Sequence, residues 1–216
     1  MLALFRCIGA AALFLAALMV SAGNQTNMLT DTCIVCHGNN GASAGPAIPN
    51  LSSMSPNYLM GAMLAYKYEN KEELNKIIDS DDRFQDVEAF ARNSTIMSRI
   101  AKGYSETEIK MIADHFSRQK LYFAKQRHGQ AEPQAGKELH EKYCASCHEN
   151  EGKSSDGDSG VLAGQWKPYF LYSMDDFLNG NREMPKKMKS KLSKMIAESG
   201  KSSLDQLADY YASISN

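Results

Sequence analysis

The clearest pattern in the sequence is an apolar stripe that occurs twice at helical spacing. In each copy, four apolar residues recur at i, i+3, i+4 and i+7, which places them on one face of an α-helix. The first set is Ile109, Ile112, Ala113 and Phe116, and the second is Leu204, Leu207, Ala208 and Tyr211. Ser105 precedes the first set with Glu108 three residues later, which is a capping box, and Ser203 and Gln206 stand in the matching places of the second. We therefore expect two similar closing helices.

The rest of the chain also repeats, with the same order of parts in each half. A short helix leads into a Cys-x-x-Cys-His motif, and a glycine follows soon afterwards, Gly41 in the first half and Gly152 in the second. A long irregular stretch that contains a methionine then leads to the closing helix. The two motifs begin 111 residues apart, which indicates an internal duplication. No stretch has a convincing strand pattern, so the predicted fold class is all-α.

A polar tract, residues 126–134, separates the two halves. It shows no periodicity and contains glycine and proline, which is typical of a linker. The sequence therefore predicts an N-terminal domain over residues 23–125 and a C-terminal domain over residues 135–216. The helix that opens the second domain is expected from about Ala135.

The first 22 residues have the pattern of a secretory signal peptide. Arg6 is followed by the apolar run Ile8–Val20, and the small residues of Val20-Ser21-Ala22 form a cleavage pattern. A retained membrane anchor is the alternative, but the apolar run is shorter than the roughly 20 residues that a spanning helix needs. We therefore predict export to the periplasm, cleavage near Ala22, and no stable membrane insertion of the mature chain.

The charge balance argues against a nucleic-acid partner. The chain has 24 Lys and Arg against 25 Asp and Glu, a formal net charge of −1. Such a balance gives no basic surface for nucleic acid, so we expect no nucleic-acid partner. The sequence also contains no second long apolar stretch.

The cysteines carry the strongest chemical signal. Cys7 lies in the predicted signal peptide, and the other four form the two motifs Cys33-Ile34-Val35-Cys36-His37 and Cys144-Ala145-Ser146-Cys147-His148. Two disulfides would not require a histidine after each pair, and a thioredoxin-like dithiol needs a βαβ setting. One zinc site shared by four cysteines would leave both histidines without a role. The motif is typical of c-type haem attachment, so we predict two covalently bound haems c.

The spacing of each motif suits this attachment. Two cysteines three residues apart on a helical turn face the same side, so Cys33 with Cys36, like Cys144 with Cys147, can form thioethers to the two vinyl groups of one porphyrin. The adjacent histidine, His37 or His148, then supplies the proximal nitrogen ligand of the iron.

A methionine is the expected second axial ligand, because it raises the reduction potential and closes the iron to small molecules. For the first haem we predict Met97, which lies just before the closing helix. For the second we predict Met184, since the following proline favours an extended or turn backbone there, with Met188 as the alternative. Met54, Met60 and Met63 are expected to be core residues.

Three histidines are alternative distal ligands. These are His115 on the first closing helix, His128 in the linker and His140 on the second opening helix. We expect all three to be solvated or locally hydrogen-bonded. A histidine ligand or an open iron would favour an enzyme over an electron carrier.

Beyond the motifs, the sequence resembles the cytochrome subunit of flavocytochrome c sulfide dehydrogenase, a relative of the soluble di-haem class I cytochromes. The likeness covers most of the mature chain and is carried by Cys33 to Pro46, Ser94 to Ser105, Lys137 to His148, Leu162 to Tyr169, and Lys186-Lys187-Met188. It implies two tandem class I cytochrome c domains, each wrapped around one haem. The segment Asn70 to Asn93 is longer than the family pattern, and its Glu72–Ile78 part predicts an added surface helix.

The resemblance also implies a partner. In that family an FAD-binding flavoprotein subunit oxidises sulfide, and the cytochrome subunit passes the electrons singly to a soluble acceptor such as a small cytochrome c. The chain itself has no G-x-G-x-x-G flavin motif after a strand, so it is expected to be non-catalytic. A stand-alone di-haem cytochrome that delivers electrons to a terminal oxidase is the alternative. A third hypothesis is a peroxidase-like enzyme with one open iron.

Overall fold

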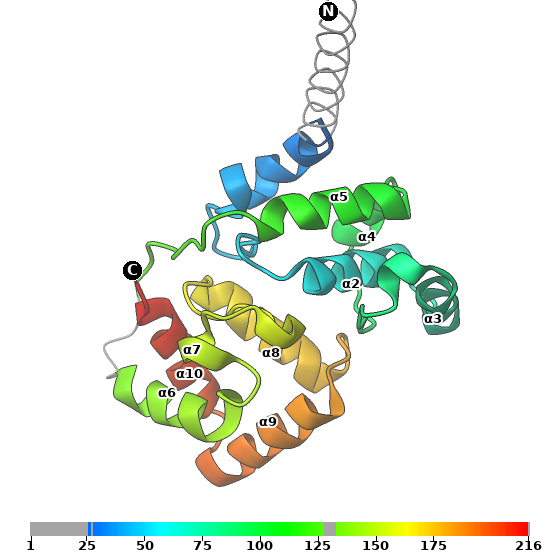
Figure 1. Ribbon diagram of the computed structural model, residues 1–216. Helices are drawn as coiled ribbons and strands as arrows, with labels where there is room; N and C mark the ends of the chain where they lie inside the picture. The colour runs from blue at the N-terminus through cyan, green and yellow to red at the C-terminus, as the bar shows by residue number, and fades with distance from the viewer. Residues whose placement is uncertain (1–25, 27, 128–132, 216) are drawn as a thin grey trace, which may run out of the picture.

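The computed structural model describes residues 26, 28–127 and 133–215, and these residues form helices and connecting loops. They contain one isolated antiparallel bridge, Arg92 with Arg182, and no longer strand pairing. The predicted all-α fold class is therefore confirmed. The predicted signal peptide, residues 1–22, and the middle of the predicted linker lie outside the described residues. Figure 1 shows the two halves side by side, with α2 of the first half facing α8 of the second.

The first half opens with a helix over residues 28–37, which ends at the first Cys-x-x-Cys-His motif. Its further elements are η1 Asn39–Gly41, α2 Pro56–Lys67, α3 Lys71–Ser80, η2 Asp82–Phe84, α4 Met97–Ala101 and α5 Glu106–Ser117. The predicted capping box of the closing helix α5 is confirmed, since Ser105 Oγ accepts from the Glu108 N–H and Glu108 Oε2 accepts from the Ser105 N–H. The whole predicted apolar stripe of α5 is buried.

The second half repeats this arrangement with shorter connections. Its elements are α6 Pro133–Leu139, the π-helical turn η3 His140–Cys144, α7 Glu149–Gly152, η4 Asp156–Asp158, α8 Lys167–Asn179, α9 Lys186–Ser199 and α10 Ser203–Ser213. The opening helix α6 begins two residues before the expected Ala135, because proline is well suited to the first helical position. The expected cap at Ser203 is wrong: its side chain is buried and donates to the Gly200 carbonyl at 2.6 Å (Oγ···O), so it does not cap α10.

The same backbone turn follows the motif in each half and places a glycine under the closing helix. Gly41 and Gly152 both have positive φ angles, 77° and 80°. Their carbonyls accept from the N–H groups of Leu51 and Leu162 at 2.8 and 2.9 Å (N···O). A Cβ at Gly41 would lie 3.1 Å from the ring of Phe116. The turn therefore brings the backbone against the closing helix at a position that favours glycine.

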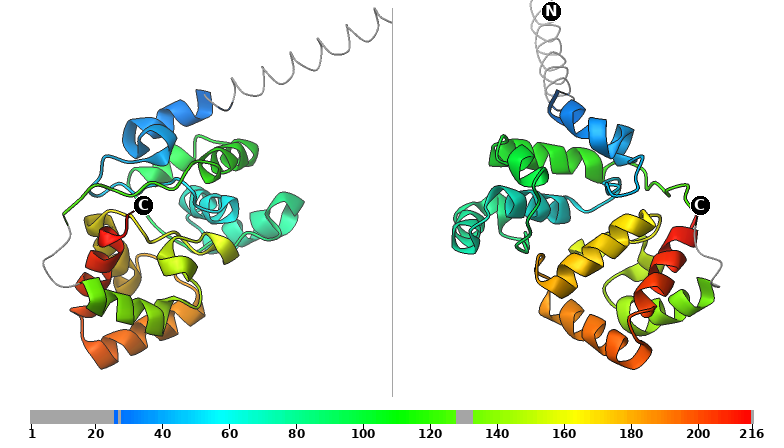
Figure 2. Two further views of the ribbon diagram at one scale, coloured as in Figure 1. Left: turned by 60° about the vertical axis from the view of Figure 1, so that its left-hand side comes forward. Right: turned by 180° about the vertical axis from the view of Figure 1, so that it is seen from behind.

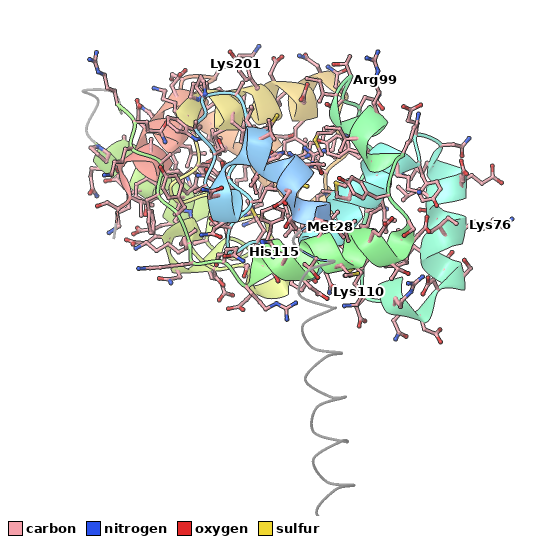
Figure 3. The ribbon with its side chains drawn as sticks, turned by 90° about the horizontal axis from the view of Figure 1, so that it is seen from above. Met28, Lys76, Arg99, Lys110, His115 and Lys201 are labelled. Carbon is pink, nitrogen blue, oxygen red and sulfur yellow. The ribbon has the colours of Figure 1, made fainter. Side chains whose placement is uncertain are left out.

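The added segment of the first half forms the expected helix. Helix α3 covers the predicted residues, and Asn70 caps it by accepting from two backbone N–H groups. Leu74 anchors α3 in the core of the first half, with 1% of its surface exposed. Lys71 pairs with Glu183 of the second half at 2.7 Å (Nζ···Oε1), whereas Lys76 lies at the outer edge of the molecule (Figure 3). Helix α3 is thus a surface helix that also contacts the other half.

Polar and apolar contacts join the two halves. Asn50 and Gln165, both buried, exchange two hydrogen bonds, from the Asn50 N–H at 3.1 Å and to the Asn50 carbonyl at 2.8 Å (N···O). Trp166 donates from its indole N–H to the Ser43 carbonyl, and a Cβ at Gly45 would lie 2.3 Å from its ring. Buried side-chain amides must be hydrogen-bonded, so this pairing favours one fixed arrangement of the halves, seen from two sides in Figure 2.

Candidate haem sites

Each motif presents one half-buried and one exposed sulfur. Cys33 and Cys144 are half-buried, Cys36 and Cys147 are exposed, and all four are free thiols. Burial raises the pKa of the Cys144 thiol to about 11. The disulfide alternative is thus absent from this structure. The described residues also contain no group of three or more His, Cys, Asp or Glu that suits a metal ion, as a shared zinc site would require.

The two motif histidines have the same orientation, and it is fixed by the backbone. The Nδ1 atoms of His37 and His148 donate to the carbonyls of Pro49 and Gly160 at 2.9 and 3.0 Å (Nδ1···O). Burial lowers the pKa of both imidazoles, which favours the neutral form that ligates metals. A carbonyl that accepts from Nδ1 leaves Nε2 available to an iron, as is usual for metal-bound histidine. These residues fit the haem that their motifs predict.

The candidate distal methionines lie at the starts of two helices. Met97 is the first residue of α4, is half-buried, and donates its backbone N–H to Ser94 Oγ. Met184 precedes α9, and Met188 lies in its first turn; both are half-buried against the core of the second half. Met188 corresponds to Met97 in that both lie in the first turn of a helix. The proline after Met184, in contrast, favours Met184 as the ligand. The geometry keeps both candidates for the second iron.

The other methionines of the first half behave as expected. Met54 and Met60 are buried, with 5% and 3% of their surfaces exposed, and Met63 packs against the same core. Met54 also accepts from the backbone N–H of Val161 at 3.3 Å (N···Sδ), which places it between the halves.

Two of the alternative histidines have contacts of their own in the described structure. His115 lies on the outside of α5 with its ring edge-on to Phe116 (Figure 3). His140 is buried and its Nδ1 is hydrogen-bonded to the hydroxyl of Tyr211 at 2.9 Å (Nδ1···Oη). His128 lies outside the described residues. His140 is therefore hydrogen-bonded within the protein, although to a residue 71 positions away and not to a sequence neighbour.

The sequence analysis missed a pair of arginines between the halves. Arg92 precedes α4 and Arg182 precedes α9, so each lies shortly before a candidate ligand methionine. The two residues form the isolated bridge of the structure. In the sequence, the one shared feature of the two arginines is their position. Each lies after the helix that follows its motif, α2 or α8, and before the candidate ligand methionine of its half. That feature becomes visible once the halves are aligned.

The chain is similar to known cytochromes along most of its length. Residues 21–118 match the family model described as cytochrome c, and residues 131–198 match the one described as cytochrome c oxidase, cbb3-type, subunit III. Cytochrome c-554(548) of Halomonas halodenitrificans is 30% identical over 88 residues, which are 41% of this chain and 84% of that protein. The cytochrome subunit of sulfide dehydrogenase of Chlorobaculum tepidum is 32% identical over 93 residues, 43% of this chain and 64% of that protein.

The fold is that of a solved cytochrome. Reduced cytochrome c4 from Pseudomonas stutzeri superposes with a TM-score of 0.68 at 20% identity, covering 89% of this chain and 98% of that one. The matched halves account for the duplicated motif, the paired closing helices and the all-α architecture. The chain therefore belongs to the cytochrome c family, as a class I di-haem electron-transfer protein with covalently bound haem c in its two cytochrome c domains.

Proposed function

We propose that this chain is the di-haem electron-transfer subunit of a periplasmic flavocytochrome c sulfide dehydrogenase. It would pass electrons one at a time from the FAD of a flavoprotein subunit to a soluble acceptor such as a small cytochrome c. The observation that carries the proposal is the pair of matched haem motifs in one chain. A reduced flavin holds two electrons, and two one-electron centres side by side can take both.

We assign the haem contacts to the residues of the two motifs. Cys33 and Cys36 would hold the first haem and Cys144 and Cys147 the second, through thioethers. His37 and His148 would ligate the irons through Nε2, with their Nδ1 atoms fixed by backbone carbonyls. When bound, each haem supplies a one-electron redox centre.

For the distal positions we assign Met97 to the first iron and Met184 to the second, with Met188 as the alternative. A thioether ligand from the start of a helix fills the sixth position and excludes water and small ligands there. That role suits electron transfer, and the oxidation of sulfide would occur on the partner flavoprotein.

The similarity to the cytochrome subunit from Chlorobaculum tepidum supports this assignment over part of both chains. The predicted signal peptide supports the periplasmic location. In addition, none of the described helices is both long and apolar enough to traverse a bilayer.

A native co-purification experiment tests the role. The matured chain, tagged at its C-terminus in its own host, is expected to bring down an FAD-containing protein. Sulfide should then reduce both haems of the complex, whereas the isolated cytochrome should be reduced far more slowly. A cytochrome that purifies alone and transfers electrons directly to a terminal oxidase would contradict the proposal and favour the stand-alone carrier. The fold that this chain shares with cytochrome c4 is compatible with that alternative.

The peroxidase-like alternative has its own test. An open iron binds carbon monoxide or cyanide rapidly, whereas methionine-ligated irons resist both. We expect slow, incomplete binding at both haems of the purified holoprotein. Rapid binding at one haem would favour the enzyme.

A further inference from the structure

In the first half, the peptide group that orients the motif histidine is also bound to the second half. The carbonyl of Pro49 accepts from His37 Nδ1 at 2.9 Å (Nδ1···O). The N–H of the same peptide group belongs to Asn50, and it donates to Gln165 Oε1 at 3.1 Å (N···O). Asn50 and Gln165 are both buried. One peptide group therefore links the histidine of the first half to a side chain of the second.

The second half makes the same connection in the opposite direction. The carbonyl of Gly160 accepts from His148 Nδ1 at 3.0 Å (Nδ1···O). The N–H of that peptide group belongs to Val161, and it donates to Met54 Sδ at 3.3 Å (N···Sδ). Val161 and Met54 are buried as well. The histidine of the second half is thus linked by one peptide group to a side chain of the first.

The two side chains that accept from these peptide groups occupy equivalent positions. Met54 and Gln165 are 111 residues apart, which is the spacing of the two motifs. Met54 lies shortly before α2 and Gln165 shortly before α8, the helices that face each other in Figure 1. The connection is therefore reciprocal, but its chemistry is not, since one side chain is a thioether and the other an amide. We name Met54 and Gln165 the crossed acceptors.

The crossed acceptors differ in strength. Gln165 Nε2 donates to the Asn50 carbonyl at 2.8 Å (N···O) while Gln165 Oε1 accepts from the Asn50 N–H. The reverse orientation of the amide would face its NH₂ group toward another donor, so the oxygen must lie toward the peptide N–H. Met54 offers only a thioether sulfur, which is a weak acceptor. The peptide group of the first half is therefore bound more strongly than that of the second.

A peptide group passes this difference on to the histidine that it holds. Hydrogen bonds that follow one another in a protein interior strengthen each other, by roughly 10–30% per bond. A stronger acceptor at the N–H makes the carbonyl oxygen of the same group more negative, so that oxygen accepts more strongly from Nδ1. A histidine that donates more strongly from Nδ1 is a more basic ligand at Nε2. A more basic ligand stabilises the oxidised iron and lowers the reduction potential.

We propose that the crossed acceptors tune the iron of the opposite half, Gln165 acting on the first haem and Met54 on the second. Gln165 lowers the reduction potential of the first haem, whereas Met54 leaves the potential of the second haem higher than an amide in its place would. Both are positioning residues, because each acts through a peptide group and a histidine. The inference rests on the proposed role of His37 and His148 as iron ligands, and not on the identity of the electron donor.

Exchange of the two side chains tests the proposal. In Met54→Gln the potential of the second haem should fall, by about threefold in the equilibrium constant of reduction, which is on the order of 30 mV for one electron. In Gln165→Met the potential of the first haem should rise by a similar factor. In each variant the haem of the substituted half should keep its potential. Redox titration of the purified holoprotein, followed through the separate NMR signals of the two haems, measures all four values.

A milder variant keeps the test open if the exchanged proteins do not mature. Met54→Leu nearly conserves the side-chain volume and removes the sulfur, so it should fold and should raise the potential of the second haem alone. Met60→Leu is its matched control. Met60 is buried in the same core, and its sulfur accepts no hydrogen bond from the described residues, so both potentials should stay unchanged.

Gln126→Met is the matched control for Gln165→Met. Gln126 also bonds two backbone groups of the second half, the Lys167 N–H and the Gln165 carbonyl, but neither group holds a histidine. Potentials that move no more than in the controls, or that move at the haem of the substituted half, would overturn the proposal even if thermal stability falls.

The same NMR spectra distinguish this failure from a failure of the assigned ligands. The Nδ1–H protons of His37 and His148 should be strongly shifted by the unpaired electron of the oxidised irons. In Gln165→Met the signal of His37 should move further while that of His148 stays in place. Histidine signals without any such shift in the parent protein would overturn the ligand assignment, and the tuning with it. Shifted signals that do not respond to the crossed acceptors would overturn the tuning alone.

Discussion

The two halves of the molecule keep the same spacing where they prepare the haem and differ in spacing where they cover it. From the first motif through α2, each residue has its counterpart 111 positions later, including the histidine carbonyl acceptors Pro49 and Gly160. The closing helices are only 95 positions apart, because α3 and its flanking turns are extra in the first half. Attachment chemistry thus tolerates little variation in spacing, whereas the covering loops tolerate a whole added helix.

The halves also differ in the polarity beside the motif. Phe116 of the first half corresponds to Tyr211 of the second, and Leu29 corresponds to His140. In the second half the Tyr211 hydroxyl is hydrogen-bonded to both His140 and Cys144. The first half has only apolar side chains at these two positions. The comparison suggests that the attachment site itself is common, while its immediate electrostatics are set separately for each haem.

Loss of one motif should have the largest effect and tests the independence of the halves. Replacing Cys144 and Cys147 with serine removes both thioether sulfurs of the second half. We expect the mass of the matured chain to fall by one haem, with the first haem still attached. Mass spectrometry of the purified chain measures this. Matured protein that keeps two haems would contradict the assignment of the cysteines.

Loss of a distal methionine should have the next largest effect. Met97→Ala should abolish half of the weak far-red band of oxidised methionine-ligated haem and should lower one potential strongly. In the second half, Met184→Ala and Met188→Ala are each other's controls, since only one of them should remove the remaining band. Absorbance spectra of the oxidised proteins decide between them. Retention of the band in both would exclude both residues as ligands.

Sequence reasoning could identify the candidate attachment residues because they lie in a short contiguous motif with its own chemistry. It could also predict the closing helices, since apolar stripes and the Ser105 cap are local signals. The cap expected at Ser203 failed because burial of that side chain outweighed its capping preference. The contact between Arg92 and Arg182 could not be predicted from local pattern, because it depends on how the halves pack against each other.

Substitution of the paired glycines should sharpen the comparison. At both Gly41 and Gly152 the positive φ angle costs an alanine about 1–2 kcal/mol. A Cβ at Gly41 would also lie 2.8 Å from the backbone nitrogen of Ser52, whereas the nearest atoms at Gly152 are side-chain atoms at 3.1 Å. Backbone atoms move away from an added Cβ less readily than side-chain atoms do, so Gly41→Ala should lower thermal stability more than Gly152→Ala. Calorimetry measures both, and the reverse order would contradict this account.

The smallest expected effect concerns the polar contacts of the second half. Tyr211→Phe gives that half the side chain that the first half has at Phe116, and removes the hydrogen bonds of the hydroxyl to the Cys144 sulfur and to His140 Nδ1. Hydrogen bonds toward a haem attachment stabilise the electron-rich reduced state, so the second haem's potential should fall slightly while the first stays constant.

Tyr210→Phe is the matched control for that substitution. The Tyr210 hydroxyl is buried without a hydrogen-bond partner among the described residues, so its removal should leave both potentials unchanged. The loss of stability in Tyr211→Phe should be about 2 kcal/mol, from about 1 kcal/mol for each of two buried hydrogen bonds. Equal shifts of both haems in Tyr211→Phe would mean that the two sites are not tuned separately. The two haems would then be coupled through the contacts between the halves.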